Sequence, residues 1–292
     1  MTGQFLSKFP GRWLAVALAT LALTGCTLGL IYPRLDSLVG WQVDRYLRLE
    51  SGQERWLDER LEERLGWHQR EQLPAWRKAL AQLRDDIAND RMTDERLSAL
   101  NDQTGDLIKA SVSGLIDDTV QLASTLTEPQ IEHLLAHLDE ETEEFKEELA
   151  ERQQDPDATE RERFDSLLED VEQWLGSVTD EQKVYLRDWQ QRSIRWSDYT
   201  LDSRQRWREF IVASLAQRSD PVATRAAVER MFLNPASLRS EAYQAAIAQQ
   251  TGHRRALQLY LLQTMTAKQK AHLLAELDDF LEDIDELLAE AR

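Results

Sequence analysis

One short pattern returns along the chain and constrains its fold more than any other feature. It consists of an apolar residue, Thr, two variable positions, Gln, and a Leu four residues after the Gln, and it occurs at 126–134, 178–186 and 265–273. A Thr followed three residues later by Gln or Glu is a capping box, which satisfies two backbone N–H groups at a helix start. Each copy therefore predicts the beginning of a helix. The capping residues are Thr127 and Gln130, Thr179 and Gln182, and Thr266 and Gln269.

Looser copies of the motif begin at Leu49, Met92 and Leu201, each with one or more positions changed. The whole chain has only 11 Gly and 7 Pro, and good helix formers such as Leu, Ala, Glu, Gln and Arg dominate it. No stretch alternates apolar and polar β-branched residues over the length of a strand. The sequence predicts an all-α protein, a multi-helix bundle of amphipathic helices with capping-box turns.

The periodicity of the apolar residues places the individual helices. Pro74 is expected to kink or divide the second of them, and the Gln-Gln-Asp-Pro-Asp stretch at 153–157 is the best linker. This linker predicts two sub-bundles divided near 153–158. The main helices are expected at 35–47, 54–87, 93–124, 127–152, 159–175, 179–196, 203–217, 237–263 and 266–289.

The N-terminus has the features of an export signal. Residues 1–25 contain Lys8 and Arg12 and no acid, and a short apolar run leads to Gly25 and Cys26. A basic start, a short apolar stretch and small residues before the cleavage point describe a secretory signal peptide. Cys26 is the only cysteine of the chain, so no internal disulfide is expected. The sequence predicts a signal peptide at 1–25, a tether at 26–35 and a helical domain at 36–292.

The ending of this segment resembles the bacterial lipobox, in which the signal is cut before a cysteine whose thiol carries diacylglycerol. The resemblance implies that Cys26 is the lipidation site; the alternative is an ordinary signal peptide with a chance cysteine. The residue after the cysteine is Thr27. In the sorting rules of such proteins Asp at that position retains the protein in the inner membrane, so Thr favours the outer membrane.

The charge of the chain restricts its partners. It has 35 Lys and Arg against 53 Asp and Glu, a formal net charge of −18. Nucleic acids are bound through neutralisation of phosphates by Lys and Arg, and anionic lipid surfaces attract basic segments. No nucleic acid is expected as a partner, and contact with a membrane is expected only through the N-terminal lipid.

Histidines provide weak candidates for chemistry. His133 and His137 lie four residues apart on one predicted helix face, but no further sure ligand accompanies them, so no metal site is predicted. His68 lies near Glu71, and no Ser, Cys or Asp can be assigned as its partner. Trp67 and His68 are expected to anchor a helix crossing instead. The sequence predicts no enzyme and no cofactor.

Tryptophans provide candidates for binding other proteins. Trp56, Trp196 and Trp207 each neighbour an Arg, and Trp67 precedes His68. Protein interfaces favour Trp and Arg, and a guanidinium group binds favourably over an indole ring. The competing interpretation is that each Trp belongs to the core and its neighbouring Arg to the solvated face. Both interpretations remain open at this stage.

Two resemblances extend this picture. The recurring motif resembles the LTxxQ motif of the Spy/CpxP-type periplasmic proteins, which are small helical proteins that include ATP-independent chaperones and sensors of envelope stress. The mature chain resembles a family of uncharacterised Gram-negative lipoproteins, known as a domain of unknown function, which implies no established activity. The second resemblance is carried by Tyr32, residues 41–47, residues 49–53, the Trp67-His68 pair and residues 72–74.

The function expected from these features is that of a lipid-anchored outer-membrane protein that faces the periplasm and binds other proteins. In its sharpest form this is chaperone-like binding of unfolded clients along the apolar helix faces. The alternative is a structural or assembly lipoprotein of the cell envelope with one dedicated partner.

Overall fold

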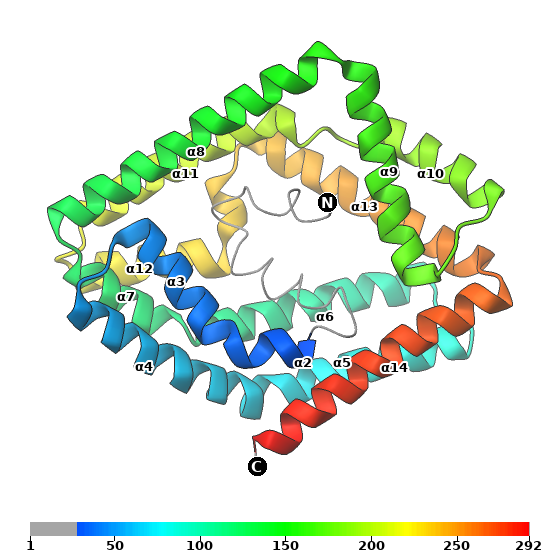
Figure 1. The fold of residues 1–292 in the computed structure, drawn as a ribbon, viewed down its shortest axis with the longest axis horizontal. Helices are drawn as coiled ribbons and strands as arrows, with labels where there is room; N and C mark the ends of the chain where they lie inside the picture. The colour runs from blue at the N-terminus through cyan, green and yellow to red at the C-terminus, as the bar shows by residue number, and fades with distance from the viewer. Residues whose placement is uncertain (1–27, 292) are drawn as a thin grey trace.

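The helices follow the sides of a four-sided frame, as Figure 1 shows. The computed structural model describes residues 28–291, and within that range all regular structure is helical. This confirms the predicted all-α class. The predicted signal peptide and Cys26 lie outside the described residues.

The helices succeed one another with short connections. They are α2 (Leu28–Ile31), the turn η1 (Tyr32–Arg34), α3 (Leu35–Leu47), α4 (Ser51–Trp67), η2 (His68–Gln72), α5 (Leu73–Ala88), α6 (Asp94–Ser113), α7 (Ile116–Thr125), α8 (Glu128–Gln154), α9 (Pro156–Leu175), α10 (Asp180–Arg192), α11 (Ser197–Leu215), α12 (Pro221–Leu233), η3 (Pro235–Leu238), α13 (Glu241–Thr264) and α14 (Ala267–Glu290).

All three full copies of the motif form capping boxes at helix starts. The side-chain oxygen of the motif glutamine accepts a hydrogen bond from the backbone N–H of Thr127, Thr179 and Thr266 at 3.0, 2.9 and 2.8 Å. The looser copy at Leu49 also caps a helix, because Glu50 takes the place of the Thr and pairs with Gln53. These boxes begin α8, α10, α14 and α4.

Two expectations about helix boundaries were wrong. The loose copy at Leu201 starts no helix, because it lies inside α11, which begins at Ser197. The expected helix 93–124 is divided at Gly114, where α6 ends. A Cβ atom at Gly114 would lie 2.6 Å from the indole of Trp67, so this glycine permits a close contact with α4. Such tertiary contacts have no counterpart in local sequence periodicity.

Each motif glutamine also reaches a second motif glutamine far away in the sequence. Gln130 donates to the side-chain oxygen of Gln53 at 2.7 Å and to the carbonyl of Arg48 at 3.1 Å. Gln269 donates to the side-chain oxygen of Gln182 at 2.8 Å and to the carbonyl of Ser177 at 2.8 Å. We call Gln53–Gln130 and Gln182–Gln269 the two glutamine pairs. Each pair ties two helix starts together at a corner of the frame.

The glutamine pairs reveal that the two halves of the chain repeat one arrangement. Next to each pair, a helix ends on a residue with positive φ, Arg48 at 47° and Gly176 at 70°. A histidine one turn after each second glutamine, His133 or His272, lies 3.1 Å from a backbone carbonyl of that ending helix. Helices α3, α4, α7 and α8 of the first half therefore correspond to α9, α10, α13 and α14 of the second.

One helix that lies between these corresponding elements in each half packs on the opposite half. Helix α5 of the first half packs on α14 of the second, whereas α11 of the second half packs on α8 of the first. The same bidentate ion pair holds both contacts: Arg84 to Asp278 at 2.8 and 2.8 Å, and Arg208 to Asp139 at 2.5 and 2.8 Å. Figure 1 shows these two helix pairs along opposite sides of the frame. The predicted division into sub-bundles near 153–158 remains a prediction.

The core is distributed along this frame. The largest cluster joins α5, α9, α10, α13 and α14 around Leu186, which has no exposed surface. Smaller clusters lie beneath α2 and α14, between α3, α4 and α7, and at the start of α8. Leu126 and Ile131, which flank the first motif copy, are both buried in the last of these clusters. Burial of such apolar surface is the main stabilising term of the fold.

Candidate functional site

The glutamines of the motif lie in the interior, and its threonines cap helices nearer the surface. Gln130, Gln182 and Gln269 are buried, with exposed fractions of 5%, 1% and 0%. Thr127, Thr179 and Thr266 cap the adjoining helices. The hydrogen bonds of these residues join helix starts within the chain, so their role is to build the frame.

The four candidate tryptophans are half-buried and lie apart from one another in the fold. Trp56 packs against the cluster of Leu49, Leu57 and Leu122, and Trp67 lies against Gly114. Trp196 precedes α11, with its ring 6.0 Å from that of Tyr243, and Trp207 lies within α11, 6.0 Å from the ring of Phe210. They form no common surface.

The candidate histidines have neighbours within the protein. His133 contacts the carbonyl of Arg45, and the rings of His133 and His137 stack at 6.2 Å. His137 lies 3.5 Å from Glu140 and 3.8 Å from Glu141. Residues 28–291 contain no group of three or more His, Cys, Asp or Glu side chains placed to hold a metal ion. No helix among these residues combines the length and apolar character that a membrane span needs.

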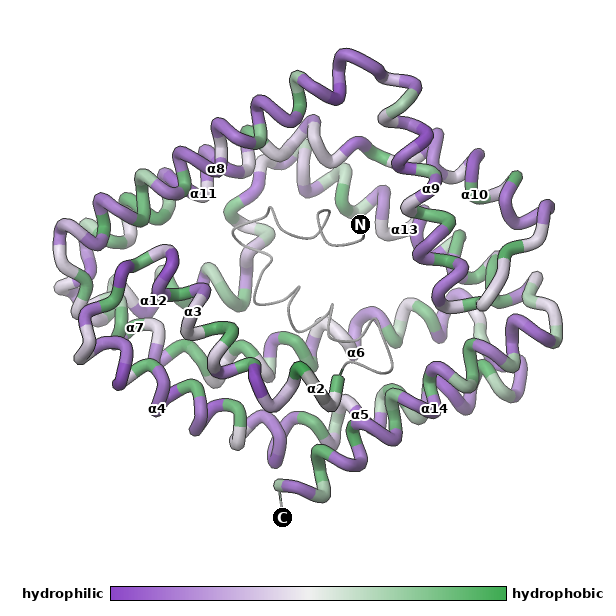
Figure 2. Tube along the Cα trace, in the orientation of Figure 1, coloured by the Kyte–Doolittle hydropathy of each residue, from purple (hydrophilic) through white to green (hydrophobic). Residues whose placement is uncertain are grey.

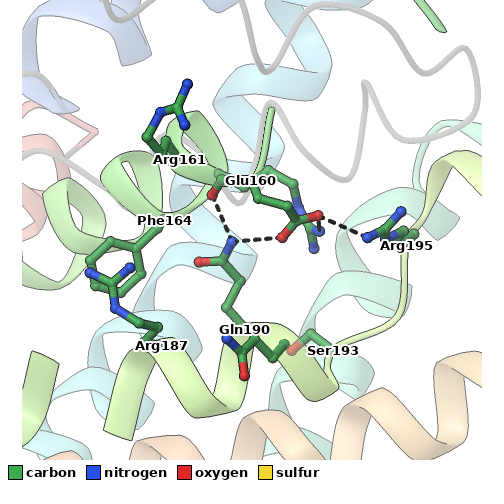
Figure 3. Close-up of a pocket in the computed structure, with 9 residues that line it drawn as sticks. Glu160, Arg161, Phe164, Arg187, Gln190, Ser193 and Arg195 are labelled. Carbon is green, nitrogen blue, oxygen red and sulfur yellow. Dashed lines mark hydrogen bonds and ion pairs between the residues drawn. The ribbon is translucent and has the colours of Figure 1, made fainter. Parts of the chain in front are cut away.

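A pocket rich in arginine lies between α9, α10 and the loop that follows α10. Its volume is about 290 Å³, and Figure 3 shows the side chains that line it. Glu160 is the only acid among the residues that line it. We call this feature the arginine pocket. Its lining residues are Glu160, Arg161, Arg163, Phe164, Arg187, Gln190, Gln191, Ser193 and Arg195.

Glu160 organises one wall of the arginine pocket. Its carboxylate lies 2.8 Å from Arg163 and 3.1 Å from Arg195. Burial acts to raise the pKa of Glu160, but the charges of both arginines and hydrogen bonds from Arg163 and Gln190 outweigh it, so this pKa lies below its ordinary value. Glu160 is therefore ionised at neutral pH and holds two of the cationic side chains in place.

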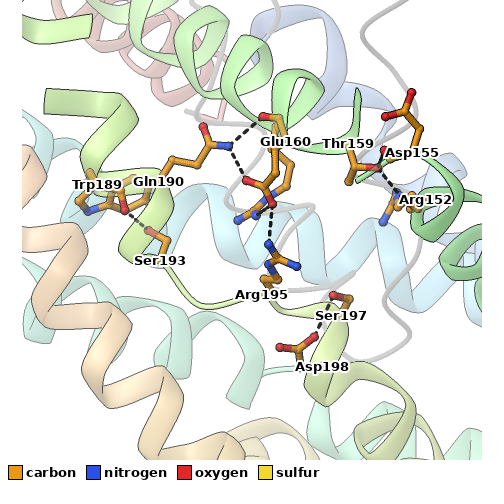
Figure 4. A network of polar contacts seen from close by, with 11 residues as sticks. Arg152, Asp155, Thr159, Glu160, Trp189, Gln190, Ser193, Arg195, Ser197 and Asp198 are labelled. Carbon is orange, nitrogen blue, oxygen red and sulfur yellow. Dashed lines mark hydrogen bonds and ion pairs between the residues drawn. The ribbon is translucent and has the colours of Figure 1, made fainter. Parts of the chain in front are cut away.

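Gln190 forms the floor of the arginine pocket and has an unused hydrogen-bond acceptor. Its side-chain N–H group donates to the carbonyl of Glu160 at 3.0 Å and to the Glu160 carboxylate at 3.2 Å. These contacts, drawn in Figures 3 and 4, fix the orientation of the amide. Gln190 is buried, with an exposed fraction of 7%, and its Oε1 has no hydrogen-bond partner. Such an orphaned acceptor is costly unless a donor meets it.

The opposite wall combines charge with an aromatic ring. The guanidinium carbon of Arg187 lies 4.1 Å from the centre of the Phe164 ring, a distance at which a cation is attracted to the ring face. Phe164 is buried, whereas Arg161 and Arg187 are exposed. Arginine binds carboxylates and phosphates through paired hydrogen bonds. The arrangement suits an anionic group that also carries a hydrogen-bond donor for Gln190.

Sequence reasoning did not single out the arginine pocket. Its arginines come from two helices and a loop, and no short motif joins Arg161 to Arg187 or Arg195. The only local signal is a concentration of Arg at 187–195. The pocket exists because the turn between α9 and α10 brings the two helices together.

Comparison with known proteins assigns the chain to a family. Residues 45–244 match a family of unknown function, DUF6279. This range includes the first glutamine pair and the whole arginine pocket, and it covers well over half of the chain. No curated protein and no solved structure matches the chain. The protein therefore belongs to the DUF6279 family of unknown function.

Proposed function

We propose that this protein is a lipid-anchored envelope protein that faces the periplasm from the outer membrane and binds one dedicated protein partner through the arginine pocket. The pocket is the observation that carries the proposal. Four arginines converge there although the whole chain has a net charge of −18. A positive site attracts an anionic segment, while the acidic surface around it repels that segment, and together they favour one orientation of binding.

The chemistry of the pocket indicates the kind of segment it binds. Arg161 and Arg187 are exposed at its rim, where they can take carboxylate groups in bidentate hydrogen bonds. The orphaned oxygen of Gln190 can accept from a backbone N–H of the same segment. We infer that the partner presents an acidic stretch of polypeptide in extended conformation.

A dedicated partner fits the surface better than unfolded clients. Of the large hydrophobic residues that the described chain exposes, only Leu38 and Trp41 lie on one helix, and Figure 2 shows polar residues interspersed along the longer helices. The apolar faces after the capping boxes are turned into the core, since Leu138, Leu273 and Leu277 are buried. The LTxxQ resemblance remains the support for the chaperone-like alternative. The exposed hydrophobic residues are Leu38, Trp41, Val184, Val212 and Val222.

The lipid anchor has a direct test. In cells fed radioactive palmitate, the protein is expected to carry label, because the lipobox resemblance places diacylglycerol on Cys26. The variant Cys26→Ser is expected to lose the label and to leave the outer-membrane fraction, whereas Thr27→Ser is expected to retain both. Label that persists in Cys26→Ser would contradict the anchor without bearing on the arginine pocket.

The binding role is tested by crosslinking in cells. A photo-crosslinking amino acid at Gln191, which lines the pocket, is expected to yield one discrete adduct. Reversing charge with Arg161→Glu, Arg187→Glu and Arg195→Glu together is expected to reduce that adduct at least tenfold, because paired interfacial charges contribute about 1.4 kcal/mol or more. The matched control is Arg206→Glu, an exposed arginine on α11 paired with Asp202.

The outcome of this experiment separates the two functions. A single adduct that the control retains and the triple variant loses supports a dedicated partner. An adduct unaffected by the triple variant would sink the proposed site. Many adducts of different mass, together with suppression of aggregation of two unrelated denatured proteins, would favour the chaperone-like alternative.

A further inference from the structure

A second cavity, unrelated to the arginine pocket, lies beneath the N-terminal helix. Its volume is about 220 Å³, and it is enclosed by α2 and η1, the η2–α5 segment, α6, α9 and α14. Leu28, Leu73, Leu80, Trp76, Phe280 and Ile284 are among the residues that line it. No lining residue is charged. We call it the apolar cavity.

One polar feature interrupts this apolar lining. The Nδ1 atom of His68 lies 2.9 Å from the hydroxyl group of Tyr32, while Nε2 of His68 is buried without a hydrogen-bond partner. Burial lowers the pKa of His68 to about 4 and raises the pKa of Tyr32. Both groups are therefore neutral at physiological pH. The cavity therefore offers an uncharged nitrogen without a hydrogen-bond partner in a mainly apolar space, whose other polar lining residues are Tyr32 and Thr104.

The local backbone places His68 there. His68 begins η2, a π-helical turn between α4 and α5 in which the N–H of Leu73 bonds the carbonyl of His68. A π-turn inserts one extra residue into a helix and is frequent at functional sites. Without it, α4 would continue into α5 with the ordinary helical rotation, and the residues of α5 would be rotated relative to His68.

The fold itself does not require an apolar cavity at this place. The two halves of the chain correspond, and four of the residues at the cavity have counterparts in the other half. There a polar group fills the space: Tyr46 donates to Glu141 at 2.5 Å, and Glu141 lies 3.9 Å from the buried Arg204. At the cavity, Trp174 takes the place of Tyr46, Phe280 that of Glu141 and Leu80 that of Arg204. Ile284 takes the place of Phe145 on α8. The apolar character is thus specific to the place where α5 packs on α14.

We propose that the apolar cavity binds the acyl chain of an uncharged, single-chain lipid, such as a monoacylglycerol, with an oxygen of its head group hydrogen-bonded to Nε2 of His68. The apolar lining takes the hydrocarbon chain. If Nε2 carries the proton it donates to a carbonyl or hydroxyl oxygen, and if it does not it accepts from a hydroxyl group. A fatty-acid anion is excluded, because no cation in the lining would compensate its buried charge.

The first experiment measures binding by native mass spectrometry and calorimetry. The full-length chain with Cys26→Ser is titrated with monodecanoylglycerol, with decan-1-ol and with decanoate at pH 8. The first two are expected to bind, with a negative heat-capacity change. The affinity of the 1-alkanols is expected to rise about fourfold for each added CH2 group until the cavity is full. Decanoate is expected to bind at least tenfold more weakly than decan-1-ol.

Two variants tie this binding to the cavity. Ala79→Phe is expected to block it, because Ala79 lines the cavity and is buried, with an exposed fraction of 6%. Ala246→Phe on α13, with the same exposed fraction of 6%, is the matched control for overpacking and is expected to bind normally. Circular dichroism verifies that both variants are folded.

His68→Leu separates hydrogen bonding from simple filling of space. It is expected to lower the affinity for decan-1-ol about tenfold while leaving the affinity for decane unchanged, because only the hydrogen bond is lost. The proposal is overturned if monodecanoylglycerol and decan-1-ol fail to bind, if Ala79→Phe binds as well as the control, or if decanoate binds best. It is also overturned if lipidated protein excludes these ligands, since its own acyl chain would then be the occupant.

Discussion

Replacement of Gln269 by Ala is expected to lower the free energy of unfolding by about 3–5 kcal/mol, since several buried polar groups lose their partners at once. The side chain of Gln269 has no exposed surface. It accepts from the Thr266 N–H and donates to the Ser177 carbonyl and to Gln182, each at 2.8 Å. Urea denaturation followed by circular dichroism measures the loss.

A change in the other glutamine pair provides the control. Gln53 is more exposed than Gln269, so water can replace its contacts, and Gln53→Ala is expected to cost only about 1 kcal/mol. Gln182→Ala and Gln269→Ala combined are expected to cost less than the sum of the single changes, because the two residues share hydrogen bonds. Equal losses for Gln53→Ala and Gln269→Ala would contradict the role assigned to burial.

The second large effect is expected at the buried ionic group where α11 packs on α8. Arg204, with an exposed fraction of 6%, lies 3.9 Å from Glu141, which also accepts from Tyr46. Burial lowers the pKa of Arg204 despite the neighbouring acids, and it raises the pKa of Tyr46. Arg204→Leu leaves Glu141 with an uncompensated negative charge, and the expected loss is about 3–5 kcal/mol.

The corresponding place in the fold, where α5 packs near α9 and α14, supplies a rescue for this loss. It has Trp174, Phe280 and Leu80 at the corresponding positions, and the rings of Trp174 and Phe280 stack at 5.9 Å. The triple change Tyr46→Trp, Glu141→Phe and Arg204→Leu is expected to restore most of the stability, because a well-packed apolar group often replaces a buried ion pair without cost. A triple variant as unstable as Arg204→Leu would show that the two places are not equivalent.

The sequence predicted those parts of the fold that are encoded locally. The capping boxes at Thr127, Thr179 and Thr266 depend on residues three positions apart, and all three begin helices. Two helix boundaries were predicted wrongly because they depend on tertiary contacts. Gly114 lies against the ring of Trp67, and the motif-like residues at Leu201 lie inside α11. The second role of the motif glutamines, to pair across the fold, needs contacts that no window of sequence contains.

The candidate sites were harder to predict from the sequence than the helices were. Trp56, Trp67, Trp196 and Trp207 are conspicuous by residue type, yet each packs within its own region of the frame. Residues that line pockets belong to several elements, so their proximity becomes visible only in three dimensions. His68 was interpreted as an anchor of a helix crossing, and its place at the apolar cavity depends on η2 and on Tyr32.

Because α5 and α11 each pack on the opposite half of the chain, the order in which this protein can fold is restricted. Helix α5, at Leu73–Ala88, packs on α14, at Ala267–Glu290. Contacts so distant in sequence form late and slow folding, because a long loop must close before they contribute. A chain emerging N-terminus first therefore cannot bury one face of α5 until its last residues arrive. Until then that apolar face stays exposed and prone to aggregation.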